Sequence, residues 1–275
     1  MDFLGGRFFK SERSLVVAGD RDICVIDPGF SYSSFREVLQ HCGSFEKPVR
    51  HVVLSHAHND HVANLKSYER VFPSLEIIVS PNSTFAKFKE ARACTDGQRV
   101  RIADVDFCFL HTPGHSRKGD DISIYFPFDK LLHCGDLAQP QGDCWEHATF
   151  ASPVPFYYDG DAYLKSIDAL LSLDFKVLMT GHGDMLSESR GRNWLNVTKR
   201  VIEQSRDVAY KLIRENSSES DSRIAEWVFR TIANARSLND ASINERMCEV
   251  DGISDYELYD LPGIQYWVQS ARKRL

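Results

Sequence analysis

The chain has 275 residues, of which 43% are hydrophobic and 26% charged, and its formal net charge is -6. This length and composition suit one large core, or one core with a small added domain. The mild acidity gives no basic field for nucleic acid, and no stretch approaches the ~20 apolar residues of a membrane span. The N-terminal residues lack the apolar run of a signal peptide, and seven scattered cysteines without a C-x-x-C pair indicate reduced thiols. We therefore expect a cytoplasmic protein that binds neither nucleic acid nor membranes.

Apolar runs and turn signals predict an alternation of strands and helices up to about residue 180. In chain order we expect strands at 8–9, 15–18 and 23–26, a helix at 33–42, a strand at 51–54, a helix at 60–72, strands at 76–79, 105–110, 122–126 and 130–133, a helix at 161–171 and a strand at 176–179. The candidate site residues described below all follow strand ends. That placement favours a layered α/β protein with its site along one edge of the sheets.

The character of the chain changes after Gly183. From there to Leu275 the sequence has no histidine and little strand signal, while its apolar residues recur at helical spacing. A last helix is expected to begin near Pro262. We therefore predict a first domain over residues 1–189 and a helical extension over 190–275. The extension is expected either to cap the site or to form a dimer contact.

The densest cluster of metal-binding residue types is Ser55-His56-Ala57-His58-Asn59-Asp60-His61. His56 and His58 follow an apolar strand, so in extended backbone they point to the same side and can share one ion. Asp60 and His61 come where the chain turns into a helix, and this pair is expected to face a second ion. Four potential ligands within six positions favour a metal site over an ordinary polar loop.

Three further residues complete this pattern, and each follows a predicted strand. His115 comes after Thr112-Pro113-Gly114, Asp136 follows Gly135, and His182 lies between Gly181 and Gly183. Alone, each would be an ordinary turn or loop residue. Together with the first cluster they supply each of two ions with three or four nitrogen and oxygen ligands, a set that suits zinc, iron or manganese. Two such ions can activate water at neutral pH.

These residues carry a resemblance to the metallo-β-lactamase superfamily, whose hallmark is H-x-H-x-D-H followed by separate His, Asp and His ligands. The resemblance runs from about Leu15 to His182, and Ile26-Asp27-Pro28-Gly29 is similar to the family's first, non-ligand motif. It implies an αββα sandwich with a dinuclear site at one edge, which makes residues 1–189 the catalytic domain.

The resemblance also implies a role for each residue of the motifs. The first ion would be bound by His56, His58 and His115, the second by Asp60, His61 and His182, with Asp136 bridging the two and Asp27 steadying the site from a buried position. The resemblance implies two divalent ions. Zinc comes first because it is the usual metal of the family, and iron or manganese are alternatives. Ions ~3.5–4 Å apart can lower the pKa of a bridging water to ~7, which generates a hydroxide for hydrolysis. Asp60 is the candidate to orient that hydroxide.

The sequence departs from the motifs of individual branches of the family, and these differences narrow the range of candidate substrates. Gly181-His182-Gly183-Asp184 replaces the longer G-H-E-Y-T motif typical of glyoxalase II, which weakens a glutathione assignment. Gln139 stands where acyl-homoserine lactonases carry a tyrosine, and the absent export signal argues against antibiotic hydrolysis. The layout resembles the glyoxalase II-like branch with C-terminal helices, which includes the thioesterase-like enzyme of alkylquinolone signalling. We therefore expect hydrolysis of a thioester or other acyl ester of a small molecule.

An aromatic-rich segment after Asp136 is expected to contact the substrate: Trp145, His147, Phe150, Phe156, Tyr157 and Tyr158. The alternative is that these rings pack the loop onto the core or onto the C-terminal helices. A lactonase or phosphodiesterase of the same fold, an iron-containing redox protein and a regulatory metal-binding protein stay open as other functions. The sequence also leaves open the exact substrate, the metal in the cell, the role of the C-terminal helices and the formation of a homodimer.

Overall fold

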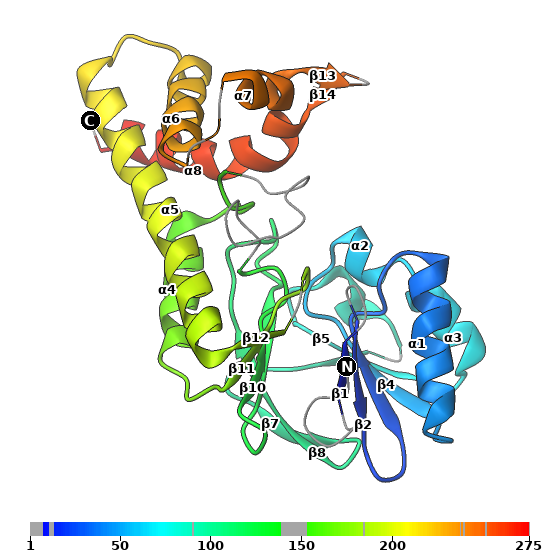
Figure 1. The fold of residues 1–275 in the computed structure, drawn as a ribbon. Coiled ribbons are helices and arrows are strands. Elements are labelled where there is room, and N and C mark those ends of the chain that lie inside the picture. The colour runs from blue at the N-terminus through cyan, green and yellow to red at the C-terminus, as the bar shows by residue number, and fades with distance from the viewer. Residues whose placement is uncertain are drawn as a thin grey trace. The chain divides into compact units, whose positions relative to one another are not determined.

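A computed structural model describes residues 8–10, 14–89, 91–138, 153–183, 185–236, 238, 240–250 and 252–274 (Figure 1). The chain forms two compact units: Met1–Leu137 with Ser172–Gly191, and Ala138–Leu171 with Arg192–Leu275. The domain boundary near residue 190 stays a prediction. Among the helices of the described ranges, none is both long enough and apolar enough to cross a membrane. Within these ranges six cysteines are free, and all but Cys248 are buried.

The first unit contains two six-stranded sheets. The first sheet takes its strands in chain order: β1 (Phe8–Lys10), β2 (Leu15–Ala18), β3 (Ile23–Ile26), β4 (Val49–Val53), β5 (Glu76–Val79) and β6 (Ala91–Ala93). The pairings β1–β2 and β2–β3 are antiparallel, whereas β3 to β6 pair in parallel. Every residue of β2 and β3 is buried. Burial on both faces explains their uninterrupted apolar runs in the sequence.

The second sheet has the order β12-β11-β10-β9-β8-β7. Its strands are β7 (Arg99–Ile102), β8 (Val105–His111), β9 (Ile122–Phe126), β10 (Leu131–His133), β11 (Val177–Met179) and β12 (Met185–Ser187). The pairing of β10 with β11 is parallel and the others are antiparallel. As a result β8, β10 and β11 run in one direction. Their carboxyl ends lie at the same edge of the sheet.

Apolar side chains from both sheets form one core cluster. It includes Val53 and Ile78 of the first sheet and Phe107 and Phe126 of the second, all at most 1% exposed. The ring of Phe126 meets that of Phe107 edge-on at 4.7 Å and that of Phe8 at 5.1 Å. Edge-to-face packing of this kind adds about 0.5–1.5 kcal/mol per pair to the burial of the rings. The predicted α/β class with two packed sheets is confirmed.

A second apolar cluster joins the first sheet to α1 (Tyr32–Ser44) and α3 (Leu65–Val71). Val38 of α1 and Tyr68 of α3 are fully buried in it, against strand residues such as Val25 and Val52. Ser31 caps α1 by accepting a hydrogen bond from the backbone N–H of Ser34.

The single helix predicted over 60–72 is wrong, because two helices occupy this stretch. A short helix α2 (Asn59–Val62) ends before Asn64, and α3 begins at Leu65. The side-chain amide of Asn64 donates to the carbonyl oxygens of Pro28 at 3.2 Å and Ser31 at 3.1 Å. This tie to the loop after β3 fixes the position of α2, which carries part of the histidine motif.

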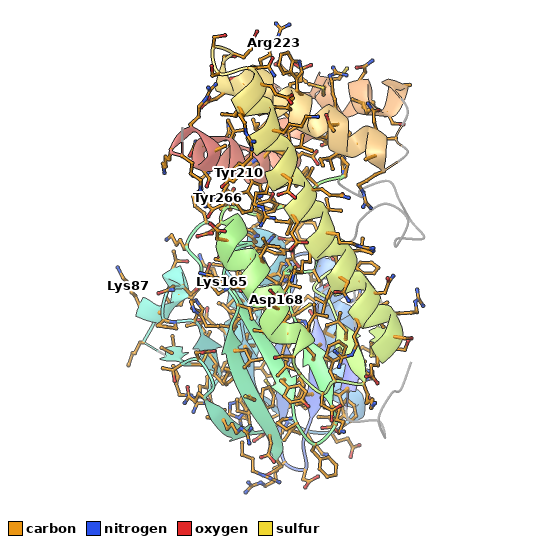
Figure 2. All side chains as sticks on the ribbon, turned by 90° about the vertical axis from the view of Figure 1, so that its left-hand side faces the viewer. Lys87, Lys165, Asp168, Tyr210, Arg223 and Tyr266 are labelled. Carbon is orange, nitrogen blue, oxygen red and sulfur yellow. The ribbon has the colours of Figure 1, made fainter. Side chains whose placement is uncertain are left out.

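The second unit is mainly helical. It contains α4 (Gly160–Leu171), most of α5 (Glu188–Glu215), α6 (Asp221–Ala235), α7 (Asp240–Met247), a hairpin of β13 (Glu249–Val250) and β14 (Ile253–Ser254), a π-helix (Tyr256–Asp260) and α8 (Leu261–Arg272). Two tyrosines labelled in Figure 2 link its helices. The hydroxyl of Tyr266 donates to Asp161 at 2.8 Å, and that of Tyr210 lies 3.0 Å from the Ser270 hydroxyl. The hairpin and the π-helix were not expected from the sequence.

Candidate metal centre

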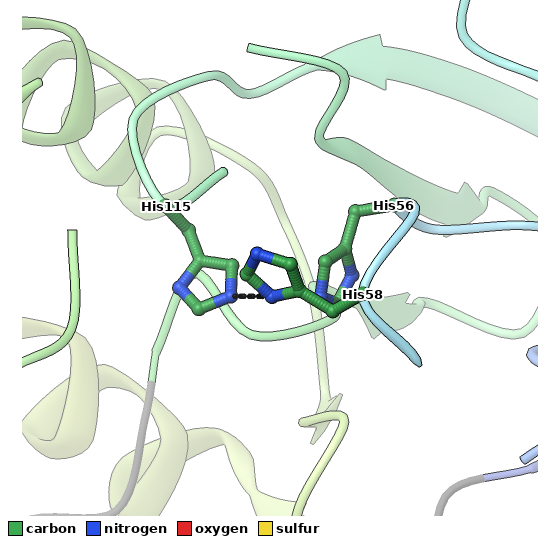
Figure 3. A group of neighbouring side chains, drawn as sticks. All are labelled: His56, His58 and His115. Carbon is green, nitrogen blue, oxygen red and sulfur yellow. Dashed lines mark hydrogen bonds between the residues drawn. The ribbon is translucent and has the colours of Figure 1, made fainter. Parts of the chain in front are cut away.

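Three histidines that are far apart in sequence form one group (Figure 3). His56 and His58 follow β4, and His115 follows β8. The Nδ1 atom of His58 lies 3.0 Å from Nε2 of His115. The ring of His56 stands edge-on to both, with centroid distances of 4.5 Å to His58 and 5.0 Å to His115. One nitrogen from each ring can therefore reach a common ion.

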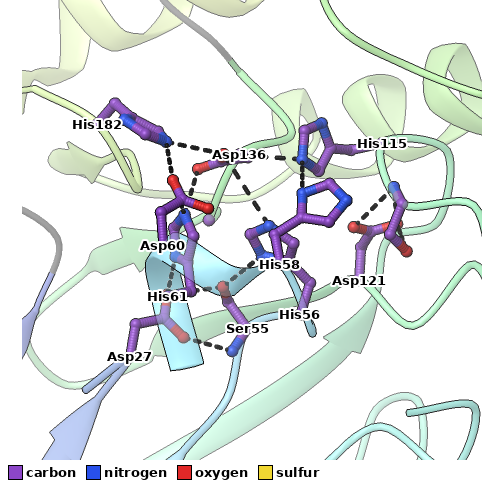
Figure 4. Close-up of polar contacts among 12 residues, drawn as sticks. Asp27, Ser55, His56, His58, Asp60, His61, His115, Asp121, Asp136 and His182 are labelled. Carbon is purple, nitrogen blue, oxygen red and sulfur yellow. Dashed lines mark hydrogen bonds and ion pairs between the residues drawn. The ribbon is translucent and has the colours of Figure 1, made fainter. Parts of the chain in front are cut away.

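A second group contains Asp60, His61, Asp136 and His182 (Figure 4). The Nε2 atom of His61 lies 3.2 Å from Oδ1 of Asp136 and 3.6 Å from Oδ2 of Asp60. The Nε2 atom of His182 lies 3.0 Å from Oδ2 of Asp136 and 3.2 Å from Oδ2 of Asp60. In each of the two groups the candidate ligand atoms all lie within 4.8 Å of one another.

Asp136 lies against both groups. Its Oδ2 atom, which is 3.0 Å from Nε2 of His182, is also 3.7 Å from Nε2 of His115 and 4.0 Å from Nε2 of His56. The side chain is 3% exposed, so its carboxylate is held inside the cluster rather than in solvent. Asp136 therefore lies within reach of ligand atoms in both groups.

Two glycines let the backbone approach this carboxylate closely. Gly135, just before Asp136, has a φ of +51°, in the left-handed region that favours glycine. The N–H of Gly181 donates to the carbonyl of Gly135 at 2.6 Å. A Cβ atom at Gly181 would lie 2.0 Å from Oδ1 of Asp136 and 2.7 Å from Cε1 of His61. The glycine beside His182 is therefore a steric requirement of the cluster.

Asp27 supports the cluster from the end of β3. It is fully buried, and its φ of +55° lies in the left-handed region, which Asp tolerates better than most residues. Its Oδ1 accepts from the Ser55 N–H at 2.7 Å, and its Oδ2 accepts from the Ser55 hydroxyl at 2.7 Å. Oδ2 also lies 2.9 Å from Nδ1 of His61. Asp27 is therefore buried beside the cluster and bonded to two of its neighbouring residues.

The two groups differ in their electrostatics. Burial lowers the pKa of His56 well below its ordinary value and also lowers that of His58, so these rings are neutral. In the second group burial acts to lower the pKa of His182, but Asp136 and Asp60 outweigh it and raise the value to about 8. Burial likewise opposes ionisation of Asp136, yet His182 and His61 hold its pKa well below the usual range. The second group thus offers carboxylate charge, and the first offers neutral nitrogen.

Both groups fit divalent metal ions. Their nitrogen and oxygen atoms are the ligands that zinc, iron and manganese share. Ligand atoms placed about 2.0–2.2 Å from one tetrahedral ion lie roughly 3.3 Å apart, close to the contacts of His61 and His182 with the two carboxylates. The buried Nε2 of His56 makes no hydrogen bond, as expected of an atom reserved for an ion. Cys134 is buried and belongs to neither group.

The predicted aromatic substrate residues fall in the second unit or outside the described residues. Trp145, His147 and Phe150 lie in the segment 139–152, which is not described. Tyr157 is fully buried, with its ring 5.6 Å from that of Tyr163, which is the packing alternative noted for this segment.

Phe156 and Tyr158 are half-buried and meet edge-on at 5.2 Å. A third ring, that of Tyr259 in the π-helix, lies 6.1 Å from Phe156 and is 43% exposed. Sequence analysis missed Tyr259. Its signal was an aromatic pair with Tyr256 in a segment that matched no regular helix or strand.

A buried acidic residue also went unnoticed. Asp121, 6% exposed, accepts from the Ser116 N–H at 3.0 and 3.1 Å and from the Ser116 hydroxyl at 2.9 Å (Figure 4). Burial raises the pKa of Asp121 to about 7. These bonds hold the turn that presents His115. The sequence signal was the pair Asp120-Asp121 directly before the largely buried strand β9.

Comparison with known proteins places this site in a family. The family model described as the metallo-beta-lactamase superfamily matches residues 10–182. The chain belongs to this superfamily. It is 32% identical over 131 residues to a hydroxyacylglutathione hydrolase of Enterobacter sp. (strain 638), covering 46% of this chain and 47% of that protein. It is 29% identical over 188 residues to metallo-beta-lactamase domain-containing protein 1 of Xenopus laevis, covering 66% and 74%. The chain spans about half the length of the hydroxyacylglutathione hydrolases that it matches.

Solved structures with the metallo-beta-lactamase fold agree with this assignment. A metallo-beta-lactamase family protein of Thermus thermophilus superposes with a TM-score of 0.59 at 16% identity, covering 78% of this chain and 82% of that one. A flavo di-iron protein mutant of Thermotoga maritima gives 0.57 at 20% identity, covering 70% and 52%. At these identities the likeness concerns the fold. The predictions of the family and of its fold are confirmed.

Proposed function

We propose that this member of the metallo-beta-lactamase superfamily is a metal-dependent hydrolase that holds two divalent ions and cleaves a thioester or other acyl ester of a small molecule. The observation that carries the proposal is the position of Asp136, whose Oδ2 lies 3.0 Å from a nitrogen of one group and 3.7 Å from a nitrogen of the other. Relatives named hydroxyacylglutathione hydrolases support the thioester class. Gly183-Asp184 after His182 still speaks against glutathione as the carrier.

The residues of the two groups would hold one ion each. His56, His58 and His115 form the first set, Asp60, His61 and His182 the second, and Asp136 lies between them. Two bound divalent ions lower the pKa of a water and polarise the acyl oxygen of a substrate. Zinc is the first candidate, with iron and manganese as alternatives that suit the same ligands.

Asp60 differs from its neighbours in its access to solvent. Its side chain is 35% exposed, whereas those of His61 and Asp136 are at most 3% exposed. Burial raises its pKa, but the hydrogen bond from His182 and the charge of His61 outweigh burial and lower it overall. Asp60 therefore stays a carboxylate and can accept a hydrogen bond from the attacking water, which would orient that water.

The exposed side chains of the site bear on which leaving group the substrate can have. A thiol leaving group has a pKa of ~8.5 and departs as a thiolate without a strong general acid, whereas an alkoxide needs one. The exposed polar side chains of the second group are a carboxylate and the partly exposed imidazole of His182. This set suits a thioester or an activated ester better than an alkyl ester.

Elemental analysis and a substrate panel test the proposal. The purified full chain is analysed for zinc, iron and manganese and assayed with acyl thioesters, aryl esters, lactones and a phosphodiester. Two equivalents of divalent metal with turnover of thioesters or aryl esters, lost on chelation and restored by the metal, is the expected result. Preference for lactones or phosphodiesters would favour the lactonase or phosphodiesterase alternative. Iron with redox activity, or metal with no turnover, would contradict the proposal in favour of a redox or regulatory protein.

We also propose that the protein works in a reducing, cytoplasmic setting. The support is that no disulfide joins the six cysteines of the described ranges. The aromatic residues Phe156 and Tyr158 stay proposals for substrate binding. A homodimer and a capping role of residues 190–275 stay proposals as well.

A further inference from the structure

We propose that Ser55 is a positioning residue whose hydroxyl relays the hydrogen-bonding influence of Asp27 to His56. Through this relay at His56, and directly at His61, one buried carboxylate fixes the ring tautomer of a ligand histidine in each of the two groups. The inference rests on the proposed function insofar as the two groups hold two ions. It concerns how the nitrogen atoms are prepared for those ions, and it does not depend on which substrate is cleaved.

Ser55 is held at three points. Its N–H donates to Oδ1 of Asp27 at 2.7 Å, its hydroxyl donates to Oδ2 of Asp27 at 2.7 Å, and its carbonyl accepts from the N–H of Ile122 at 2.8 Å. The residue is 1% exposed. A Cβ atom at Gly135 would lie 2.9 Å from the Ser55 hydroxyl oxygen, so the backbone there packs closely over it. The hydroxyl therefore keeps one orientation, with little room for a water beside it.

Counting hydrogens determines the direction of each bond. A serine hydroxyl has one hydrogen, and a carboxylate only accepts. The hydroxyl hydrogen of Ser55 is used in the bond to Asp27. The 3.0 Å contact between the Ser55 oxygen and Nδ1 of His56 then requires His56 to be the donor. A neutral imidazole with its proton on Nδ1 presents a lone pair on Nε2, the atom of His56 that is buried without a hydrogen bond.

The same carboxylate acts on His61 without an intermediary. Nδ1 of His61 donates to Oδ2 of Asp27 at 2.9 Å, which leaves Nε2 on the side of Asp136, 3.2 Å from its Oδ1. In both rings Nδ1 faces Asp27 or its relay, and Nε2 faces the cluster (Figure 4). Metal ions bind the unprotonated nitrogen, and the bond made by the other nitrogen decides which one that is. Asp27 therefore prepares one ligand in each group.

The path from Asp27 to His56 passes through Ser55, whereas the path to His61 is direct, so substitutions can separate the two. Removing the Ser55 hydroxyl breaks the path to His56 and leaves the direct bond to His61 intact. Replacing Asp27 by Asn puts a donor where both paths need an acceptor, and Asn tolerates the φ of +55° at this position. The first change should disturb one metal subsite and the second change should disturb both.

The experiment uses the full chain, treated with chelator and titrated with zinc alone in a calorimeter. The variants are Ser55→Ala, Ser55→Thr, which keeps the hydroxyl, Asp27→Asn, and Ser205→Ala. Ser205 is the matched control, because its hydroxyl is also fully buried and donates to the carbonyl of Val201 in the second unit. Long-range 15N–1H NMR of the histidine rings, in zinc-loaded and zinc-free protein, reports the tautomers independently of activity. Ser55→Cys, with a weak hydrogen-bonding group of similar size, replaces Ser55→Ala if circular dichroism shows that the alanine variant does not fold.

We expect Ser55→Ala to lower the affinity for one zinc ion about 10- to 100-fold, the range typical of losing an outer hydrogen-bond partner. The affinity for the other zinc ion should change less than about threefold. The Nδ1–H signal of His56 should be lost while that of His61 persists. Ser55→Thr should behave as wild type. Asp27→Asn should lower the affinity for both zinc ions, and Ser205→Ala should change the affinity for neither. Wild-type affinity for both ions in Ser55→Ala, equal weakening of both, an unchanged His56 tautomer, or fewer than two zinc ions on the wild-type chain would each overturn the relay. A wild-type chain that binds two zinc ions, shows the expected variant pattern and hydrolyses nothing would overturn the proposed function and leave the relay standing.

Discussion

A single carboxylate, Asp136, decides how the seven candidate ligands are organised. Without it the cluster would be three neutral histidines beside a separate acidic group. Because its Oδ2 contacts nitrogens of both groups, two cations can share one compensating charge and lie close together. The remaining charge comes from Asp60, which is the more exposed of the two carboxylates. In the proposed function, Asp136 has the structural role and Asp60 the chemical one.

Asp60→Asn tests the chemical role. The substitution keeps the shape and one acceptor oxygen but removes the charge that is proposed to orient the water. We expect kcat on the best substrate of the panel to fall at least about 100-fold, the scale typical of losing a catalytic group, with little change in KM. Steady-state kinetics and elemental analysis on the same preparation check it. Full turnover with two metal ions still bound would show that Asp60 is a ligand only.

Asp121→Asn is expected to change the pH dependence of stability. Burial raises the pKa of Asp121 in the folded protein to about 7, well above that of an unfolded Asp near 3.8. The folded state therefore binds more protons between these values, so the contribution of this group to stability is full below about pH 4 and is lost as the pH rises through about 7. Asparagine stays neutral, so the variant should gain stability relative to wild type over this range, by on the order of a few kcal/mol at pH 8.

Urea unfolding at a series of pH values measures this difference. Asp106→Asn is the matched control, because Asp106 is a carboxyl of the same sheet with a side chain that is 59% exposed. A difference between Asp121→Asn and wild type that is flat from pH 4 to pH 8 would contradict the prediction.

At the scale of elements, the site depends on where five strands end. The loops after β3, β4, β8, β10 and β11 each contribute residues to the cluster, and parallel β10 and β11 bring Asp136 and His182 side by side. Short strands are sufficient, since β10 and β11 have three residues each. The turns after them are fixed by the bond from the Gly181 N–H to the Gly135 carbonyl. The strands bring these residues near one another, and the turns fix the final positions of their side chains.

Gly181→Ala is expected to remove metal binding while leaving the sheets folded. The added methyl group would overlap Oδ1 of Asp136 at 2.0 Å, so that carboxylate must move out of the cluster. Zinc affinity should fall at least about tenfold, by the same reasoning that applies to misplaced ligands in other metal sites. Gly43→Ala is the control, because nothing lies within 4 Å of a Cβ there and the residue is part of helix α1. Calorimetric zinc titration of both variants, alongside far-ultraviolet circular dichroism, checks the prediction.

Several elements and residues could be predicted from the sequence because their signals are local. Strands such as 76–79 and 122–126 are short apolar runs between turns, and the ligand motifs follow strand ends directly. The break between α2 and α3 could not be predicted, because it depends on Asn64 reaching carbonyls of Pro28 and Ser31 more than thirty positions away. Ser55 and Asp121 escaped notice for a related reason, since a buried hydrogen bond through a side chain leaves no periodic pattern.

At the scale of the whole molecule, metal binding and stability are expected to be linked. A ligand that binds only the folded state adds about 4.1 kcal/mol when its concentration is 1,000 times its dissociation constant. The second group carries two carboxylates, Asp60 and Asp136, whose mutual repulsion bound cations would relieve. We expect zinc-loaded protein to unfold at a higher temperature than chelated protein. Calorimetric melting with and without chelator measures this, and equal melting temperatures would contradict a pair of ions held by the folded chain.

The division into two units also separates the natural spectroscopic probes of the chain. In a Trp145→Phe variant the remaining tryptophans, at positions 194, 227 and 267, belong to the unit Ala138–Leu171 with Arg192–Leu275, whereas the seven candidate ligands belong to the other. Indole fluorescence therefore follows one unit during unfolding, and the visible absorption of cobalt substituted at the cluster follows the other. A melting curve recorded at both wavelengths would show directly whether the two halves of the chain lose their structure together or in sequence.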